Sequence, residues 1–380
     1  MMAILFWASL LLLAYTYAGY PLLVAAWARL RPRPAHSPTA TPTLTVVVVA
    51  HNEAARTRDR LSNLLALDYP RERVEILFAS DGSTDGTAEV ARALKPAGVE
   101  VIAFETRRGK AAVLNDVIPK THGEIVVLTD ARQTFDDAAL RALAGGFADP
   151  RVGAVSGELI LDGSGGQPTG VAEGVGFYWR YEKFIRRNES RVDSTVGATG
   201  AIYAIRCDLF EPIPADTLLD DVLIPMRIAR RGYRVLFEPR ARAYDRPAAT
   251  AGEEFTRKVR TIAGNFQLFA REPWLLNPFQ NRLWFQTVSH KGLRLVGPLC
   301  LMAAFVANLG LLDRPGYPWL LAGQLAFYGA ALGGYTLRRL GKTVRPLAVP
   351  YVFCLLNCAA VVALVRLVSG RQRATWEKVL

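Results

Sequence analysis

The chain has 380 residues, of which 51% are hydrophobic, and its formal net charge is +12. This length fits one large domain or two ordinary ones. The apolar residues concentrate at both ends and the charged ones in the middle, a layout typical of a membrane protein that carries a soluble domain. Four cysteines do not make a disulfide framework, and the four histidines lack zinc-ligand spacing. Because much of the positive charge flanks apolar segments, anionic lipid head groups account for it, and no nucleic-acid partner is expected.

Four apolar segments are long enough to be membrane spans, which need about 20 residues for a ~30 Å hydrocarbon core. The first covers residues 1–30 and has no Lys or Arg ahead of its long apolar stretch, which favours a retained anchor over a signal peptide. The others lie near the C-terminus, at Gly292–Leu312, Pro318–Leu337 and Leu347–Val368. We therefore predict one N-terminal and about three C-terminal transmembrane helices.

The placement of Lys and Arg predicts the orientation of these segments. The basic stretches "ARLRPRP" and "LRRLGKTVRP" are expected in the cytoplasm, and the loop "LDRPGYP", which is poor in positive charge, is expected outside. This predicts a multi-pass protein of the cell (inner) membrane with its central domain in the cytoplasm. The basic tail, residues 371–380, would then end outside. Either the last segment is re-entrant or interfacial, or the charge rule fails at this end.

Composition divides the rest of the chain. Residues 31–43 form a Pro-rich connector that leads into a central domain, residues 44–255. Residues 256–290 mix aromatic and basic side chains, which predicts interfacial helices on the cytoplasmic face, with core packing as the alternative. Residues 291–370 then hold the C-terminal transmembrane segments.

The central domain alternates strand-like and helix-like segments. The apolar runs "LTVVVVA", "VEILFAS", "VEVIAFE" and "EIVVLTD" each precede a segment of helical periodicity. Four such units joined by short links predict a doubly wound, mostly parallel sheet with helices on both faces. Ligands of such sheets bind beyond the C-terminal ends of the strands.

Polar residues follow every one of these strands. They are His51 to Glu53, Asp81 to Gly86, Arg107 to Lys110, and Asp130. Each group alone has a structural interpretation, such as a helix N-cap in "DGSTDGT". Together they place carboxylates, amides and cations along one sheet edge, which a nucleotide site requires. The chain has no G-x-G-x-x-G after the first strand and no G-x-x-x-x-G-K-[ST], which disfavours a dehydrogenase-type site.

Several ordered motifs resemble those of the family 2 glycosyltransferases, the membrane enzymes related to cellulose, chitin, hyaluronan and poly-N-acetylglucosamine synthases. They are "VVVVAHNEA", "FASDGSTDGT", "RRGKAAVLND", "GATGAIYAIR" and "LLDDVLIPMRIARRGYRV", and the similarity covers about residues 43–267. The resemblance implies a GT-A domain, an α/β fold that binds a nucleotide-sugar.

The resemblance also assigns the donor site by position. Asn52, Glu53 and Asp81 would contact the uracil and ribose of a UDP-sugar, and Lys110 would lie near the base or the phosphates. Asp130 would lie beside the diphosphate and its cation, which we expect to be Mg²⁺ or Mn²⁺.

Asp220 and Asp221 match the catalytic acidic pair of the family, and the resemblance makes Asp221 the general base. Inverting transfer needs a carboxylate that takes the proton of the acceptor hydroxyl. An adjacent carboxylate can raise the pKa of such a base. The alternative is that both acids only begin a helix, at its positive end.

Two positions depart from the family pattern. The Q-x-x-R-W motif is replaced by a stretch in which Arg257 and Arg260 keep a spacing that lets both project toward a diphosphate, while Thr261 replaces the Trp. The D-x-D motif becomes Asp130-Ala131-Arg132. We predict that Asp130 still serves the metal, and that Arg132 faces away or partly replaces it as a diphosphate cation.

The leading interpretation is a membrane-embedded inverting glycosyltransferase that acts on a growing polysaccharide or a lipid-linked glycan. Its expected partners are a nucleotide-sugar donor, a glycan or lipid-linked acceptor, membrane lipids and other polysaccharide-assembly proteins. Two alternatives stay open: a catalytically silent glycan- or nucleotide-binding partner of another synthase, and a lipid-phosphate sugar transferase.

Overall fold

The structure is a computed structural model that describes residues 1–33, 41–161, 170–247, 250–340, 342 and 344–371. Most of the predicted Pro-rich connector, residues 34–40, and most of the predicted basic tail, residues 372–380, lie outside these described residues.

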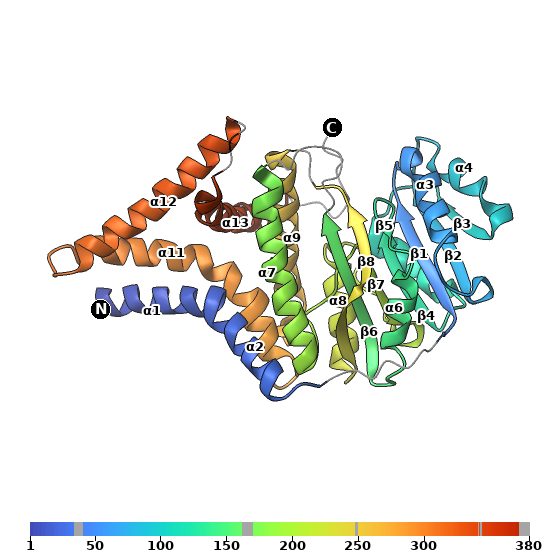
Figure 1. Ribbon diagram of the computed structural model, residues 1–380, viewed down its shortest axis with the longest axis horizontal. Helices are drawn as coiled ribbons and strands as arrows, with labels where there is room; N and C mark the ends of the chain where they lie inside the picture. Colours follow the sequence, from blue (N-terminus) through green and yellow to red (C-terminus); the bar gives the residue numbers. More distant parts are fainter. Residues whose placement is uncertain (34–40, 162–169, 248–249, 341, 343, 372–380) are drawn as a thin grey trace.

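The centre of the molecule is an eight-stranded sheet with the strand order β3-β2-β1-β4-β7-β6-β8-β5 (Figure 1). β1 to β4 are mutually parallel, whereas β7 runs antiparallel to β4 and β6, and β5 runs antiparallel to β8. This confirms the predicted mostly parallel α/β sheet. The strands are β1 Leu44–Ala50, β2 Val74–Asp81, β3 Val99–Phe104, β4 Ile125–Asp130, β5 Thr134–Phe135, β6 Val152–Leu161, β7 Tyr203–Arg206 and β8 Arg234–Asp245.

Both faces of the sheet are buried, which explains why its strands are continuous apolar runs rather than alternating ones. Along β1, Val47 belongs to one apolar core, while Val46 and Val48 belong to the core on the opposite face. The Val47 core takes side chains from α5 (Lys110–Val117) and α8 (Asp220–Arg230), and the other core takes them from α3 (Ala54–Leu65) and α6 (Ala139–Gly146). The short α4 (Thr87–Arg92) lies over the β3 edge.

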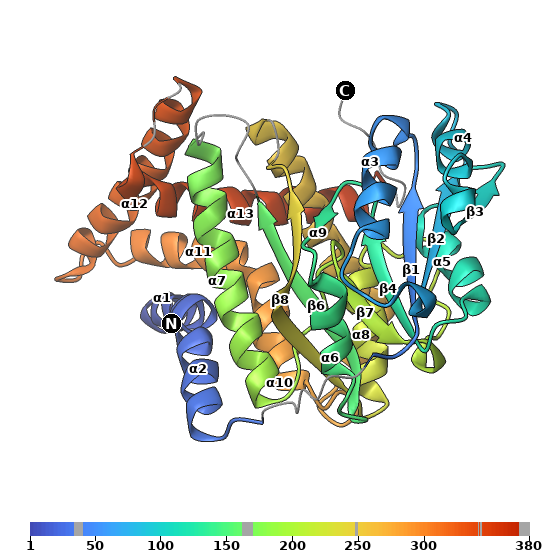
Figure 2. The ribbon, with the colours of Figure 1, turned by 45° about the vertical axis from the view of Figure 1, so that its right-hand side comes forward.

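Two long helices connect the sheet to the apolar ends of the chain. α7 (Gly170–Val192) contacts β8 on one side and α2 (Tyr20–Leu30) on the other (Figures 1 and 2). α9 (Ala251–Arg271) contacts α13 (Arg345–Val368), and Ala359 and Ala363 of α13 belong to the same core as Val47. α9 begins before residue 256, so one continuous helix crosses the boundary predicted there.

Among the residues that the structure describes, three helical segments are long and apolar enough to cross a membrane: Met2–Leu30, Trp284–Leu309 and Arg345–Val368. The first consists of α1 (Met2–Ala14), a π-helical turn and α2, and the second consists of α10 (Trp284–Gln286), the π-helical turn Thr287–Gly292 and α11 (Leu293–Leu309). α12 (Tyr317–Arg339), where a fourth span is predicted, is a helix of 23 residues but is not among them. Its sequence is diluted by glycine, tyrosine and glutamine, which lowers its hydropathy.

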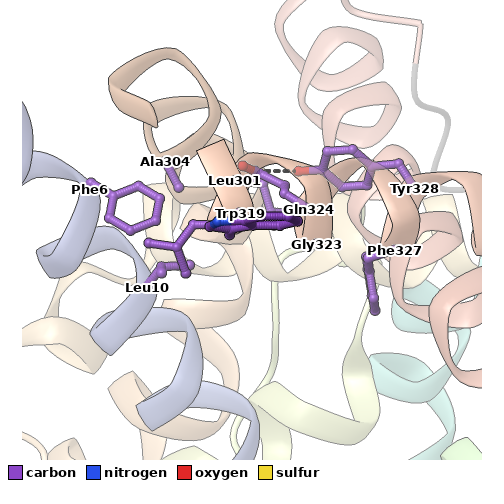
Figure 3. A pocket seen from close by; sticks show the side chains of 10 residues that line it. Phe6, Leu10, Leu301, Ala304, Trp319, Gly323, Gln324, Phe327 and Tyr328 are labelled. Carbon is purple, nitrogen blue, oxygen red and sulfur yellow. Dashed lines mark hydrogen bonds between the residues drawn. The ribbon is translucent and has the colours of Figure 1, made fainter. Parts of the chain in front are cut away.

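An apolar pocket of about 370 Å³ lies where α1, α11 and α12 meet (Figure 3). Phe6, Leu301 and Phe327 are among its lining side chains. At its wall the Gln324 side-chain amide donates a hydrogen bond to the Tyr328 hydroxyl at 3.0 Å. Since all three helices carry exposed apolar side chains here, this surface suits contact with lipid chains.

Candidate active site

The turn after β2 is built around the Asp81 carboxylate. Its two oxygens accept hydrogen bonds from the backbone N–H groups of Arg108 (2.7 Å) and Gly109 (2.8 Å), at the start of α5. Gly82 follows with φ +59°, and a Cβ there would lie 2.4 Å from the Arg107 backbone nitrogen. Only glycine fits this close approach, so Asp81 and Gly82 together fix the position at which α5 begins.

Asn52 and Glu53 lie opposite that turn. Asn52 adopts φ +54°, and its side-chain oxygen accepts a hydrogen bond from the Thr84 N–H at 2.8 Å. Asparagine is one of the few residues that tolerates this backbone region. Glu53 forms an ion pair with Arg56 at 2.8 Å. The structure thus brings Asn52, Glu53 and Asp81 to one edge of the sheet, where the resemblance places the donor nucleoside.

Lys110 connects Asp130 to the acidic pair at the start of α8. Its Nζ lies 2.9 Å from Asp130 Oδ1 and 3.3 Å from Asp220 Oδ2, and all three side chains are close to 10% exposed. Burial opposes the charged form of this lysine, but Asp130 and Asp220 outweigh it and raise the pKa of Lys110. A cation is thereby held between two carboxylates, at the point where a diphosphate would arrive.

Arg132 points toward Asp130 rather than away from it. Its Nη2 lies 3.8 Å from Asp130 Oδ2 and 3.9 Å from Asp245 Oδ2, and Gln133 donates to Asp245 at 2.9 Å. Two carboxylates therefore converge on one guanidinium group. Asp245, at the end of β8, is a site residue that sequence reasoning missed, because it lies more than one hundred positions away from the D-A-R motif.

The acidic residues fit a divalent ion only together with a bound diphosphate. No group of three or more His, Cys, Asp or Glu side chains able to hold a metal occurs in the described part of the chain. Asp130 and Asp245 supply two carboxylates at one point, and Mg²⁺ is commonly bound by one or two carboxylates plus substrate phosphates. The residues present are therefore compatible with a metal that binds with the donor.

Asp220 and Asp221 begin α8 but have different surroundings. Asp220 is 8% exposed, and its Oδ2 lies within 3.3 Å of both Lys110 Nζ and the Tyr203 hydroxyl. Asp221 is partly exposed, and its Oδ2 accepts the Gly200 N–H at 2.9 Å. Burial and the neighbouring Asp220 raise the pKa of Asp221, against the opposing effects of Lys110, Lys291 and Arg186. Of the two, Asp221 has the properties of a proton acceptor.

The structure separates the two arginines of α9. Arg260 is mostly buried; burial lowers its pKa, and the charges of Asp220, Asp130 and Asp221 oppose that change. Arg257 is exposed, and no hydrogen bond or ion pair joins it to these carboxylates among the residues described. Arg260 therefore reaches the candidate site, whereas Arg257 lies on the outer surface of the helix.

Two further residues support the site and escaped sequence reasoning. Tyr203, fully buried on β7, donates to Asp220, and burial followed by the Asp220 charge raises the pKa of Tyr203. Arg60 of α3 donates to Thr129 Oγ1 at 2.9 Å, and burial lowers the pKa of Arg60 to about 9. Arg60 is one of three arginines in α3, and nothing in the local sequence indicates which of them is buried.

Comparison with known proteins agrees with this geometry. Residues 45–213 match the sequence model of glycosyl transferase family 2. Curated relatives include the poly-beta-1,6-N-acetyl-D-glucosamine synthases of Staphylococcus epidermidis, 25% identical over 241 residues, and of Staphylococcus aureus strain COL, 26% identical over 239 residues. These alignments cover 61% and 60% of this chain and 56% of each relative, so the chain matches little more than half of their length.

A solved structure matches nearly the whole chain. It is the mannosyltransferase PcManGT from Pyrobaculum calidifontis in complex with GDP-Man and Mn²⁺, with a TM-score of 0.73 and 26% identity over 97% of this chain and 99% of that one. The fold is accordingly that of a GT-A glycosyltransferase. Residues 45–213 are thus similar to a glycosyl transferase family 2 domain, in agreement with the resemblance of the sequence motifs.

Proposed function

We propose that this protein is a membrane-embedded inverting glycosyltransferase with Asp221 as its general base. The observation that supports this most directly is the partly exposed Asp221 carboxylate. Its Oδ2 accepts the Gly200 N–H at 2.9 Å, and the neighbouring Asp220 forms an ion pair with Lys110. Burial and Asp220 raise its pKa, which makes the carboxylate a better proton acceptor.

In the proposed reaction the acceptor hydroxyl attacks the anomeric carbon of the donor sugar. Asp221 takes the hydroxyl proton, a new glycosidic C–O bond forms, and the bond from the anomeric carbon to the diphosphate breaks. The nucleoside diphosphate leaves with the bonding electron pair. Attack from the face opposite the leaving group inverts the configuration at the anomeric carbon.

The leaving diphosphate needs its negative charge compensated. Lys110, Arg132 and Arg260 bring cations to this side of Asp220 and Asp130. Asp130 and Asp245 would hold a divalent ion, which would supply additional positive charge to the phosphates. The Mn²⁺ in the PcManGT complex supports this assignment.

The comparisons favour two donors. The curated relatives are poly-beta-1,6-N-acetyl-D-glucosamine synthases, which supports UDP-N-acetylglucosamine as the donor and a growing polysaccharide as the acceptor. PcManGT, whose match extends over 97% of this chain, is described in complex with GDP-Man, which supports GDP-mannose as the second candidate. We put UDP-N-acetylglucosamine first, because it agrees with the motif-based assignment of a UDP-sugar.

The apolar helices support a place in the cell membrane with the catalytic domain in the cytoplasm, where nucleotide-sugars are made available. A glycan or lipid-linked acceptor would then reach Asp221 from the side of α7 and α11, and other polysaccharide-assembly proteins could receive the product. A lipid-phosphate sugar transferase would share the donor site but release a single-sugar lipid, so sizing the product separates the two activities.

The test uses the purified full-length chain in detergent with UDP-N-acetylglucosamine, GDP-mannose and other nucleotide-sugars, each with Mg²⁺ or Mn²⁺. One donor should be hydrolysed or transferred, and Asp221→Asn should lower the rate at least 100-fold while nucleotide binding stays within threefold of wild type. If no donor is turned over and Asp221→Asn changes nothing measurable, the protein is instead a silent binding partner of another synthase.

A further inference from the structure

A buried ionic cluster lies between α7 and the helical segment Trp284–Leu309, beside the base. Glu182 of α7 is 5% exposed and accepts from His290 Nε2 (3.0 Å), Arg294 Nη1 (3.0 Å) and Arg186 Nε (3.4 Å). Burial alone would raise the pKa of Glu182, but His290 and Arg294 hold it well below the usual value. One carboxylate thus collects cations from two helices.

His290 extends this cluster to the N-terminal helix. Its Nδ1 lies 2.9 Å from Glu189 Oε1, and the Tyr20 hydroxyl donates to the same oxygen at 2.5 Å. Glu189 and Tyr20 are fully buried. His290 belongs to a π-helical turn, a form common at functional positions inside helices. The two apolar segments are therefore joined to α7 by hydrogen bonds.

Arg186 connects this cluster to the loop that holds the base. Its Nη1 donates to Thr199 Oγ1 at 2.6 Å, and the Thr199 N–H donates to Ser156 Oγ at 3.0 Å. The next N–H, that of Gly200, is the donor to Asp221 Oδ2. A Cβ at position 200 would lie 3.1 Å from that oxygen, so loop and carboxylate are in tight contact.

Arg186 also acts electrostatically on Asp221 and lowers its pKa. The groups that interact electrostatically with it include Asp220 on α8, Lys110 on α5, Lys291 on the π-helical turn, Arg186 on α7, Arg260 on α9 and Tyr203 on β7. Lys110 also serves the donor side. Arg186 makes its contacts with Glu182 and Thr199 instead, so its role is separable from donor binding.

We propose that Arg186 is a positioning residue for the base: held by Glu182, which His290 binds in turn, it fixes Thr199 so that the Gly200 N–H keeps Asp221 oriented toward the acceptor. This rests on the proposed role of Asp221. The chain of contacts begins at Tyr20, so the packing of the membrane-associated helices sets the geometry of the base. None of these contacts involves the donor-side residues Asp81 or Asp130.

The hydroxyl of Thr199 gives the sharpest test. The assay measures kcat and KM of the full-length chain with whichever of UDP-N-acetylglucosamine and GDP-mannose it turns over. Thr199→Val keeps the shape but removes the acceptor for Arg186, and should lower kcat about 10-fold with the donor KM within twofold. Thr199→Ser retains the hydroxyl and should stay within twofold of wild type. Wild-type kcat in Thr199→Val overturns the proposal.

The pH dependence of kcat/KM tests the charge of Arg186. Asp221 must be ionised to accept a proton, so activity is lost as the pH falls through its pKa. Arg186→Met removes a cation that lowers this pKa, and the acidic limb should move to higher pH; Arg186→Lys keeps the charge and should leave that limb in place. Arg187→Met, at an exposed position one residue along α7, is the matched control. Identical acidic limbs for Arg186→Met and Arg187→Met contradict the proposal.

Asp221→Asn separates the two hypotheses. If it remains active, the base assignment fails, and the positioning role fails with it. If it is inactive while the Thr199 and Arg186 variants match wild type, only the positioning role fails. Should Arg186→Met not fold, the comparison of Thr199→Val with Thr199→Ser, checked by thermal unfolding, still decides the outcome.

Discussion

At the scale of single residues, Lys110 combines an ionic contact with a proposed function. It neutralises Asp130 and Asp220 in a buried site, and under the proposed function it would offer the donor diphosphate a cation. Removing one partner of a buried ionic group is much more costly than removing the whole group, because an uncompensated charge remains. The energetic role and the chemical role can therefore be measured separately.

Lys110→Met should lower the free energy of unfolding by about 3–5 kcal/mol, the range measured when a buried ion pair loses one partner. It should also abolish measurable transfer. The double variant Lys110→Met with Asp130→Asn removes one of the stranded carboxylates, so urea unfolding should show part of the stability restored, without activity. A double variant no more stable than Lys110→Met would contradict this account.

Under the proposed function, Arg132 and a divalent ion would compete for the same two carboxylates, which makes chelation informative. Asp130 and Asp245 both approach the Arg132 guanidinium, and in the proposed function the same two carboxylates would hold the ion. We therefore expect EDTA to abolish transfer and Mn²⁺ or Mg²⁺ to restore it. Arg132→Ala should lower the rate less than about 10-fold, since the ion remains. Initial rates with and without EDTA give the answer.

The control for Arg132 is Arg141→Ala, which removes an exposed ion pair with Asp68 and should leave the rate within twofold. If EDTA leaves activity intact while Arg132→Ala abolishes it, the arginine has replaced the metal.

At the scale of elements, α9 is the helix on which the candidate site and the apolar helices meet. Its inner face packs through Gly264 on Leu219, the residue before α8, its Arg260 faces the carboxylates, and α13 covers it from the other side. The sequence pattern placed Arg257 and Arg260 together, but a helix cannot present an exposed and a buried position to the same ligand equally well.

Gly264 tests how closely α9 must approach the segment that leads into α8. A Cβ there would lie 2.5 Å from Leu219 Cγ, so Gly264→Ala should push α9 away from Leu219 and lower stability by about 1–3 kcal/mol, as overpacking does. Leu219 directly precedes the catalytic pair, so transfer should fall as well. Both effects can be read from thermal unfolding and initial rates.

The matched control is Gly252→Ala at the exposed start of the same helix, where the nearest atom is the Thr250 hydroxyl at 3.8 Å. Here the higher helix propensity of alanine should stabilise by up to about 1 kcal/mol, with the rate unchanged. Equal stability changes in the two variants would show that the contact between Gly264 and Leu219 is not tight.

At the scale of the whole molecule, the apolar ends are not a separable anchor. Tyr20 binds Glu189 of α7, and α13 shares an apolar core with the sheet. Charged groups at the start of Trp284–Leu309 turn toward α7 rather than outward, which is the usual arrangement for ionisable residues near a membrane. Domain and membrane-associated helices therefore form one packed unit.

This integration predicts that the protein stays with membranes under conditions that release peripheral proteins. After alkaline carbonate extraction of membranes, the full-length chain should remain in the pellet and dissolve only in detergent, because three long apolar helices hold it. Release of most of the chain into the carbonate supernatant would instead indicate surface attachment.

The local sequence determined much of this protein. The four apolar runs and their helical partners predicted a parallel sheet, and the rule that parallel strands end at a common edge brought Asn52, Asp81, Lys110 and Asp130 together correctly. The resemblance to the family motif singled out Asp220 and Asp221 as a pair. Each of these inferences depends on local periodicity or on a short motif, which the sequence records directly.

The tertiary structure determined the contacts between residues that lie far apart in the sequence. It distinguished buried Asp220 from partly exposed Asp221, brought Asp245 to Arg132, and linked Tyr20 through His290 and Arg186 to the base. These partners are separated by tens to hundreds of positions and lie on antiparallel strands or helices whose pairing no local pattern encodes. Their contacts follow from how the layers bury apolar surface against one another, which is a property of the folded chain as a whole.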